Sequence, residues 1–266
     1  MNISTTLETT FVSPDTNVLN FCPNHYVIEK YLPHVDNELL PGVKWGHYCQ
    51  LYSPAFWKYM YLVYGPHIDY NNHKIGTTII EEIVACILGG YGMPSELGIA
   101  AFERLRSESL IKPGISFKKI HQALNDPFEL QDGSLKRYRF YNQKSKYVYN
   151  LLQRSDLDKI PLEDDGSLRT WLLSVDGIGF KTASWITRNW LQSENVAILD
   201  IHILRAGKIA GFFSGHCDVA THYLHLETSY ISFCNALGVL PSNMDAIIWN
   251  YMKKTNKLAL QVLSIT

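Results

Sequence analysis

The sequence predicts a mostly α-helical fold, and three observations support this prediction. From Ile79 onward, apolar residues recur every three to four positions, which is the spacing of an amphipathic helix. Glycine-rich stretches such as Gly89–Gly92 interrupt that spacing, as turns between helices do. With 46% hydrophobic and 18% charged residues, the chain has enough apolar side chains for a sizeable core and is unlike a disordered protein.

The N-terminal residues 1–74 differ from the rest of the chain. Aromatic residues are frequent there, and the stretch Trp45–Tyr64 is interpreted as a strand or a short helix packed on a core. We therefore expect an N-terminal aromatic-rich segment over residues 1–74, irregular or α/β in structure, and a helical domain over residues 75–266. Long helices are not expected in the N-terminal segment because prolines recur at Pro14, Pro23, Pro33, Pro41, Pro54 and Pro66.

From Thr77 onward the pattern predicts a series of helices joined by loops. Ser95 is expected to be the N-cap of the second helix, because a serine hydroxyl can accept a hydrogen bond from a first-turn amide. An acidic loop, Asp156–Asp165, follows the fourth helix. The expected helices are Thr77–Leu88, Ser95–Leu105, Ser116–Ala123, Tyr141–Leu152, Ser167–Ser174, Phe180–Leu191, Ile201–Ala210, Ala220–Leu237 and, as the last one, Ser242–Lys253.

Composition excludes several classes of protein and site. No apolar run approaches the roughly 18 residues of a transmembrane helix, and the polar start Met1–Thr10 is unlike a signal peptide. We expect an intracellular protein, in the cytoplasm or nucleoid or in a eukaryotic nucleus, with no membrane partner. The cysteines form no CxxC pair, so no metal and no cofactor is expected. They are also odd in number and scattered, which indicates a reducing compartment: Cys22, Cys49, Cys86, Cys217 and Cys234.

The net charge of −1 argues weakly against binding to nucleic acid, but charge is unevenly distributed along the chain. Between Lys112 and Lys146, eight lysines and arginines face only three acidic residues. Lys144 and Lys146, at the end of this basic stripe, are candidate contacts to a DNA backbone. The alternative is an ordinary solvated face of a helix.

The most informative stretch runs from Leu172 to His202, where two predicted helices flank a turn with two glycines. Gly177 and Gly179 allow a tight turn and a close approach of the backbone to a ligand. The second helix begins at this turn, and a helix N-terminus is a ready anion site that a DNA phosphate fits. Gly177, Ile178 and Gly179 are therefore candidate DNA-binding residues. The alternative is an ordinary turn between two helices.

The motif VDGIGFKTAS around this turn resembles the helix–hairpin–helix of the DNA glycosylase superfamily, and ILDIH resembles the superfamily's catalytic aspartate segment. Lys181 and Asp200 are 19 residues apart, the separation found in eukaryotic-type 8-oxoguanine DNA glycosylases. The similarity covers roughly residues 75–254, with the hairpin at about 167–191. The resemblance implies a helix–hairpin–helix glycosylase fold, although the family's N-terminal sheet domain is longer than the segment present here.

The resemblance further implies base excision through a covalent lysine. Displacement of a base at C1′ needs a neutral amine, and Lys181 lies in a first helical turn, where the helix dipole disfavours a positive charge. Asp200 can stabilise a developing oxocarbenium charge and also cap the next helix. Taken alone, such residues are usually a solvated charge and a simple cap. His202 matches the family's Asp-x-His and either contacts a phosphate, orients Asp200 or merely packs.

Asp245 and Trp249 share one helix face and are the candidate base pocket. The resemblance implies that such a pair reads and stacks a flipped base, and a carboxylate can accept from both N1–H and N2–H of guanine. The alternative is that Ser242-Asn243-Met244-Asp245 forms a capping box and Trp249 belongs to the core. Trp185, four residues after Lys181, stands where the eukaryotic-type enzymes usually have a cysteine, which puts the 8-oxoguanine assignment in doubt.

These residues predict a DNA glycosylase/AP lyase that acts as a monomer on double-stranded DNA with a damaged base, most readily 8-oxoguanine. Tyr91, in the glycine-rich turn, is a candidate wedge for the gap left by a flipped base, or a structural residue. A four-cysteine cluster like that of endonuclease III is missing, which disfavours that branch. Three alternatives remain: a glycosylase of the same fold that excises a bulky modified cytosine, for example from foreign DNA, a non-catalytic DNA-binding module, and a helical domain with an accidental turn.

Overall fold

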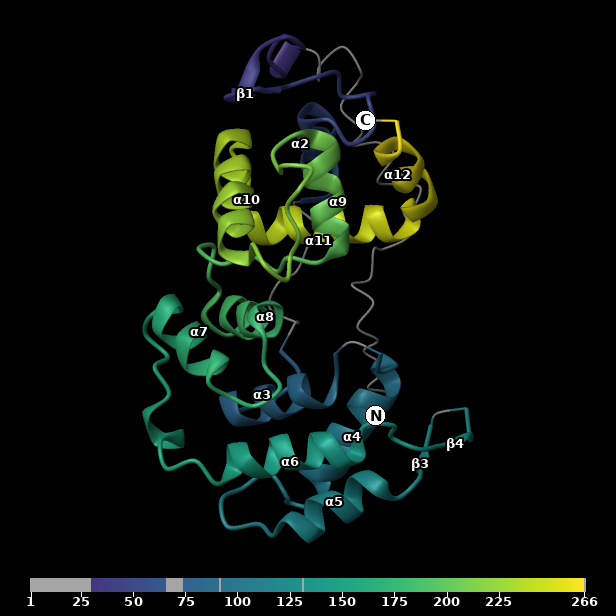
Figure 1. Cartoon of the computed structure of the whole chain (residues 1–266), viewed down its shortest axis with the longest axis vertical. Helices are drawn as coiled ribbons and strands as arrows, with labels where there is room; N and C mark the ends of the chain where they lie inside the picture. Colours follow the sequence, from purple (N-terminus) through teal and green to yellow (C-terminus); the bar gives the residue numbers. More distant parts are fainter. Residues whose placement is uncertain (1–29, 66–73, 91, 131, 266) are drawn as a thin grey trace. The chain divides into compact units, whose positions relative to one another are not determined.

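The computed structural model describes residues 30–65, 74–90, 92–130 and 132–265. They form two compact units: unit 1 holds residues 74–192, and unit 2 combines residues 30–65 with residues 193–265. Both units are mostly helical, and each has only a two-stranded antiparallel sheet among its described residues (Figure 1). The mostly α-helical fold class is therefore confirmed. The expected domain boundary near residue 74 stays a prediction, because the residues before it are described only in part.

Unit 1 is built around helix α3, which contacts α4, α6 and α8, while α5 and α6 lie side by side (Figure 1). Its core consists of the apolar faces that the sequence spacing predicts, with Ile83, Ile87 and Phe102 fully buried. The elements of this unit are α3 (Ile79–Leu88), α4 (Ser95–Ser107), α5 (Phe117–Asn125), β3 (Phe128–Glu129), β4 (Leu135–Lys136), α6 (Tyr141–Leu152), the 3-10 helix η3 (Leu157–Lys159), α7 (Asp165–Leu173) and α8 (Phe180–Leu191).

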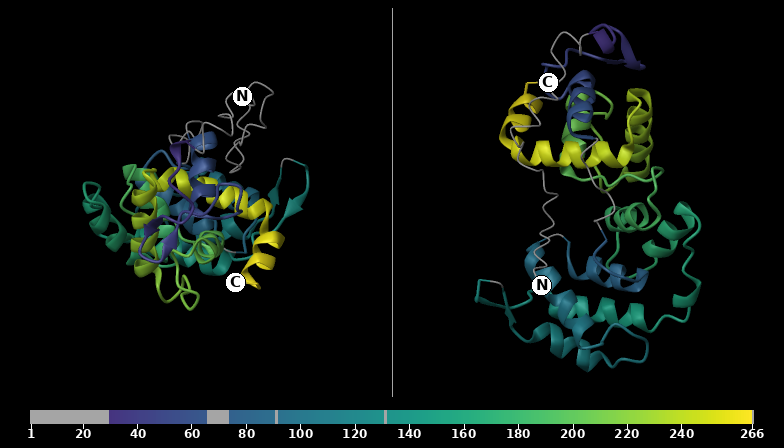
Figure 2. Two further views of the ribbon diagram at one scale, coloured as in Figure 1. Left: turned by 90° about the horizontal axis from the view of Figure 1, so that it is seen from above. Right: turned by 180° about the vertical axis from the view of Figure 1, so that it is seen from behind.

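Unit 2 is organised by helix α11, which packs on α2, α9 and α10, while α12 turns back against α9 (Figures 1 and 2). Fully buried Trp57, Ile247 and Ile248 form part of its core. The elements are β1 (Glu38–Leu40), β2 (Val43–Lys44), α2 (Pro54–Tyr64), α9 (Ile201–Ala210), α10 (Tyr223–Leu237), α11 (Pro241–Lys254) and α12 (Asn256–Leu263). The aromatic stretch Trp45–Tyr64 thus contains a helix, α2. The helix that was expected to be the last corresponds to α11, and a further helix, α12, follows it.

The starts of three helices differ from their expected positions, each for a local reason. Pro94, with φ −58°, is the N-cap of α4, and Ser95 is already the first helical residue, so the expected serine cap is wrong. α7 begins earlier than expected because the Asp164 carboxylate accepts a hydrogen bond from the Ser167 amide at 2.7 Å. α10 begins later because the Asp218 carboxylate bonds the amides of Ala220 and Thr221 and holds them in a turn.

Within the described ranges, no single helix is long and apolar enough to cross a membrane; α10 and α11 reach the required length and composition only as a pair, which is bent by 102°. The same ranges contain no group of three or more His, Cys, Asp or Glu side chains placed to hold a metal ion. Cys49, Cys86, Cys217 and Cys234 are free thiols.

Candidate active site

The turn between α7 and α8, residues 174–179, is the predicted hairpin turn. Gly177 has φ +82°, and a Cβ placed there would lie 2.4 Å from the ring of Tyr147. The turn therefore needs glycine for its backbone conformation and for its contact with α6. The buried Ile178 anchors the turn, and its amide donates to the Val175 carbonyl at 3.1 Å. Gly179 is the N-cap of α8, and no described side chain caps this helix.

The hairpin turn is held by two side chains of helix α6 and by Arg154, which lies two residues beyond the end of that helix. Tyr147 packs its ring against Gly177. One turn later, the Asn150 amide donates to the Asp176 carboxylate at 2.7 Å, and Arg154 donates to the Ser174 carbonyl at 3.2 Å. The turn's backbone is therefore held by α6 and by the residues just after it, while no side chain among the described residues caps the start of α8.

Lys181, the predicted nucleophile, is exposed in the first turn of α8. Trp185 follows one turn later on the same face, half-buried, with the Arg188 guanidinium 5.8 Å from its ring centre. A half-buried indole next to an exposed lysine gives this face of α8 one nucleophilic and one aromatic group.

The other predicted DNA contacts of unit 1 differ in their surroundings. Lys144 is half-buried on α6, burial lowers its pKa, and its Nζ lies 5.8 Å from the ring centre of Tyr147. Lys144 and Gly177 therefore share one tyrosine as a neighbour. Lys146 is exposed on the same helix. Tyr91 lies outside the described residues.

Asp200, the second predicted catalytic residue, is the N-cap of α9 in unit 2. Its Oδ1 accepts from the His202 amide at 2.8 Å and from the Ile203 amide at 3.1 Å. The predicted capping role is confirmed. The two amides therefore fix the orientation of the Asp200 carboxylate at the start of α9.

The base-pocket candidates of unit 2 lie on α11. The ring of Trp249 meets the His202 ring edge-on, with 6.3 Å between centres and an interplanar angle of 86°. His202 is therefore linked both to Asp200, through its amide, and to Trp249, through its ring. The Lys253 ammonium lies 4.7 Å from the centre of the Trp249 ring, at a distance typical of a cation–π contact. Sequence reasoning missed Lys253, although Asp245, Trp249 and Lys253 follow one another at the four-residue spacing of a helix face.

The capping-box interpretation of Asp245 is wrong. α11 begins at Pro241 with Leu240 as N-cap, so Asp245 lies inside the helix, where it is buried. Glu194 binds the helix start instead: its carboxylate accepts from the Ser242 amide at 2.9 Å and from the Ser242 hydroxyl. Asp245 is therefore a buried carboxylate in a helix interior, a placement that a residue serving only as a cap does not need.

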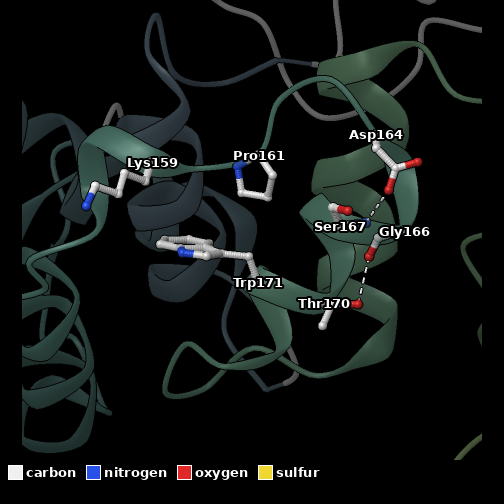
Figure 3. Close-up of a pocket in the computed structure, with 7 residues that line it drawn as sticks. All are labelled: Lys159, Pro161, Asp164, Gly166, Ser167, Thr170 and Trp171. Atoms are coloured by element: carbon white, nitrogen blue, oxygen red, sulfur yellow. Dashed lines mark hydrogen bonds between the residues drawn. The ribbon is translucent and has the colours of Figure 1, made fainter.

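A surface hollow of about 570 Å³ lies along the start of α7 and contains none of the predicted site residues (Figure 3). Its polar side chains serve the helix itself: Asp164 caps it, and the Thr170 hydroxyl donates to the Gly166 carbonyl at 2.7 Å. Trp171 donates to the Asp156 carboxylate at 2.8 Å. Its lining residues are Lys159, Pro161, Asp164, Gly166, Ser167, Thr170 and Trp171.

Similarity to known proteins agrees with this geometry. The profile of a family described as 8-oxoguanine DNA glycosylase matches residues 67–239. An 8-oxoguanine DNA glycosylase/AP lyase of Metallosphaera sedula is 32% identical over 191 residues, which are 67% of this chain and 83% of that protein. The protein of the same name from Saccharolobus solfataricus is 34% identical over 137 residues, which are 46% of this chain and 62% of that protein.

Among solved structures, the Methanocaldococcus jannaschii 8-oxoguanine glycosylase/lyase in complex with a 15mer DNA containing 8-oxoguanine has a TM-score of 0.51. It is 20% identical and covers 70% of this chain and 84% of that chain. This likeness confirms the helix–hairpin–helix glycosylase fold. The matched profile covers well over half of the chain and includes the hairpin turn, Lys181 and Asp200. The chain therefore belongs to the 8-oxoguanine DNA glycosylase family of helix–hairpin–helix proteins.

Proposed function

We propose that this protein is a DNA glycosylase/AP lyase that flips 8-oxoguanine out of double-stranded DNA and excises it. The observation that carries the proposal is that the span matched to the family contains both Lys181, in the first turn of α8 in unit 1, and Asp200, at the N-cap of α9 in unit 2. Relatives named 8-oxoguanine DNA glycosylase/AP lyase support the same activity.

Lys181 is the proposed nucleophile. The lone pair of its neutral amine forms a bond to C1′ as the bond from C1′ to the base breaks. The base leaves with the electron pair of the broken bond and gains a proton. Opening of the sugar ring gives a Schiff base between Lys181 and C1′. The Schiff base acidifies the C2′ proton, and its loss expels the 3′ phosphate by β-elimination. Asp200 stabilises the positive charge that develops on the sugar and assists the proton transfers.

The hairpin turn is the proposed phosphate site. Gly177, Ile178 and Gly179 present backbone to the DNA, and the uncapped start of α8 offers amides and a positive dipole end. Lys144 and Lys146 add positive charge on α6, where Lys144 shares Tyr147 with the turn. Such contacts position the duplex and carry no base information.

Asp245 and Trp249 are the proposed base-reading residues. Asp245 accepts from N1–H and N2–H of the oxidised guanine, and Trp249 stacks on its ring, a contact worth roughly 1–3 kcal/mol. Lys253, which already lies over the Trp249 ring, and His202, at its edge, complete this part of the pocket.

A second candidate keeps the enzyme and changes the base. Trp185 is a half-buried indole one turn after Lys181, in the place where eukaryotic-type enzymes usually have a cysteine. A different residue there favours a base of different shape, such as a cytosine with a bulky substituent, whose exocyclic amine Asp245 also binds.

Excision assays on single-lesion duplexes test the proposal. We expect release of 8-oxoguanine opposite cytosine, with strand cleavage before any alkali treatment because the lysine supports β-elimination. Release of a 5-substituted cytosine instead would transfer the assignment to the second candidate. Tight binding without release of any base would contradict the enzyme and indicate a DNA-binding module. We further propose that the protein acts as a monomer. Because its proposed substrate is DNA, we also propose that it is located in the cytoplasm or nucleoid, or in a eukaryotic nucleus.

A further inference from the structure

The segment that leads into Asp200 is buried but belongs to no helix or strand. Val196, Ala197, Ile198 and Leu199 are each at most 5% exposed. Buried backbone amides and carbonyls outside regular structure need partners from elsewhere, because leaving one unpaired destabilises the fold. The partners of this segment therefore identify what determines the position of Asp200.

Two side chains of α10 bind the backbone of this segment. The Glu227 carboxylate accepts from the Ala197 amide at 2.8 Å. The Tyr223 hydroxyl donates to the Ala197 carbonyl at 2.7 Å and accepts from the Leu199 amide at 3.2 Å. Tyr223 and Glu227 are four residues apart, so they lie on one face of α10, and both are buried, with exposures of 4% and 5%. We call this pair the α10 clamp.

The clamp and the N-cap fix Asp200 from both sides. Leu199, bound by Tyr223, directly precedes Asp200, and the amides of α9 bind the Asp200 carboxylate from the other side. An aspartate side chain is short, so a shift of its backbone moves the carboxylate by a similar distance. A misplacement of about 1 Å can reduce a catalysed rate by about 10²-fold.

We propose that Tyr223 and Glu227 are positioning residues that hold the Asp200 carboxylate where excision requires it. This inference rests on the proposed function and assigns to α10 a part in that reaction. A buried carboxylate is costly to desolvate, and here it binds the backbone of the segment that carries Asp200.

The test is Tyr223→Phe, with Tyr230→Phe as a matched control. The Tyr230 hydroxyl is also buried on α10 and also donates to a backbone carbonyl, that of Pro241, at 2.8 Å. We expect Tyr223→Phe to lower the single-turnover rate constant for 8-oxoguanine excision by about tenfold or more, with the Kd for the duplex within about twofold of wild type. Tyr230→Phe should stay within about twofold in both quantities. Equal loss of rate in the two variants, or no loss in Tyr223→Phe, would overturn the proposal.

Two further measurements separate a positioning role from loss of folding and from failure of the proposed function. Glu227→Gln keeps an oxygen acceptor for the Ala197 amide and should therefore retain the excision rate that Glu227→Leu loses.

Hydrogen exchange can be measured without any enzyme activity. Tyr223→Phe should speed exchange of the Leu199 amide, while Tyr230→Phe should not. Wild-type protein that excises no 8-oxoguanine would contradict the proposed function, and unchanged exchange at Leu199 would overturn the clamp on its own.

Discussion

The starts of α8 and α9 solve the same structural problem in opposite ways. Every helix begins with amides that lack a partner inside the helix. At α8 the N-cap is Gly179, and no described side chain caps the helix. At α9 the N-cap is Asp200, whose carboxylate accepts from two of these amides. The first start suits an external phosphate, and the second uses its amides to orient a carboxylate. A helix N-terminus is therefore suited either to bind an anion or to orient a carboxylate of its own chain.

The segments before the two starts are nevertheless both supported by polar side chains from elsewhere in the same unit. In unit 1, Asn150 of α6 and Arg154, two residues past the end of α6, bind the hairpin turn. In unit 2, Tyr223 and Glu227 of α10 bind the segment before Asp200. In both units the segment before the helix start is held by side chains that are distant in sequence, so the proposed chemistry depends on packing inside each unit.

The largest effect is expected at the start of α8 from Lys181→Gln. Glutamine has no nucleophilic amine, so borohydride trapping on damaged DNA and lyase activity should fall below detection. Lys181 is exposed, so the melting temperature and the Kd for the duplex should stay close to wild type. The control is Lys257→Gln, an exposed lysine on α12. Full excision by Lys181→Gln would disprove the role of this lysine.

The second prediction separates the two functions of Asp200. Asparagine is a good N-cap, so Asp200→Asn should keep the bonds from the His202 and Ile203 amides and the melting temperature. It removes the charge, and the single-turnover excision rate should fall by about 10²-fold or more. Asp200→Ala should lose both the rate and about 1 kcal/mol of unfolding free energy. A near-normal rate in Asp200→Asn would refute the electrostatic role.

The third prediction distinguishes the two glycines of the hairpin turn. Gly177→Ala places a Cβ 2.4 Å from Tyr147 at φ +82°, so it should destabilise unit 1 by about 1–3 kcal/mol and weaken DNA binding. At Gly179 an added Cβ meets no described atom within 4 Å, so Gly179→Ala should fold normally and lose only DNA affinity. Urea unfolding and a binding titration measure both quantities. Unchanged affinity in both variants would argue against a phosphate at this turn.

The smallest effect concerns the support of the hairpin by Asp156. Hydrogen bonds from Arg154 and then from Trp171 lower the pKa of Asp156 to about 2. A carboxyl group with a lowered pKa stabilises the fold above its ordinary pKa, and this contribution disappears as the pH falls through the lowered value. Asp156→Asn should therefore melt below wild type at pH 7, and the difference should close near pH 2. Asp158→Asn, at an exposed neighbour, is the control, and an equal difference at both pH values would contradict the assignment.

Local patterns in the sequence predict local features of the structure. The apolar spacing predicts the helices, and the position of Asp200 before α9 predicts its cap, because the bonds involved span two or three residues. The expected cap at Ser95 fails because Pro94, with its fixed φ, takes that place. Lys253 follows the same helical spacing as Trp249 and was within reach of sequence reasoning.

Contacts between distant residues could not be predicted in this way. Glu194 binds the Ser242 amide at the start of α11, although the two residues are 48 positions apart in the sequence. Because Glu194 serves this helix start, the capping-box interpretation of Asp245 is wrong. The α10 clamp spans 24 to 30 residues and depends on how α10 packs against a segment that has no periodic pattern. The supports of the proposed site are therefore visible only in the folded chain.

The most direct test of the central claim is to identify the residue that becomes covalently bound to DNA. Wild-type protein is treated with borohydride on a duplex that carries 8-oxoguanine opposite cytosine, and the adduct is located by peptide mass spectrometry. The account predicts a single adduct on Lys181. An adduct on another amine, such as Lys144, or no adduct on a duplex that the protein binds and cleaves, would contradict it.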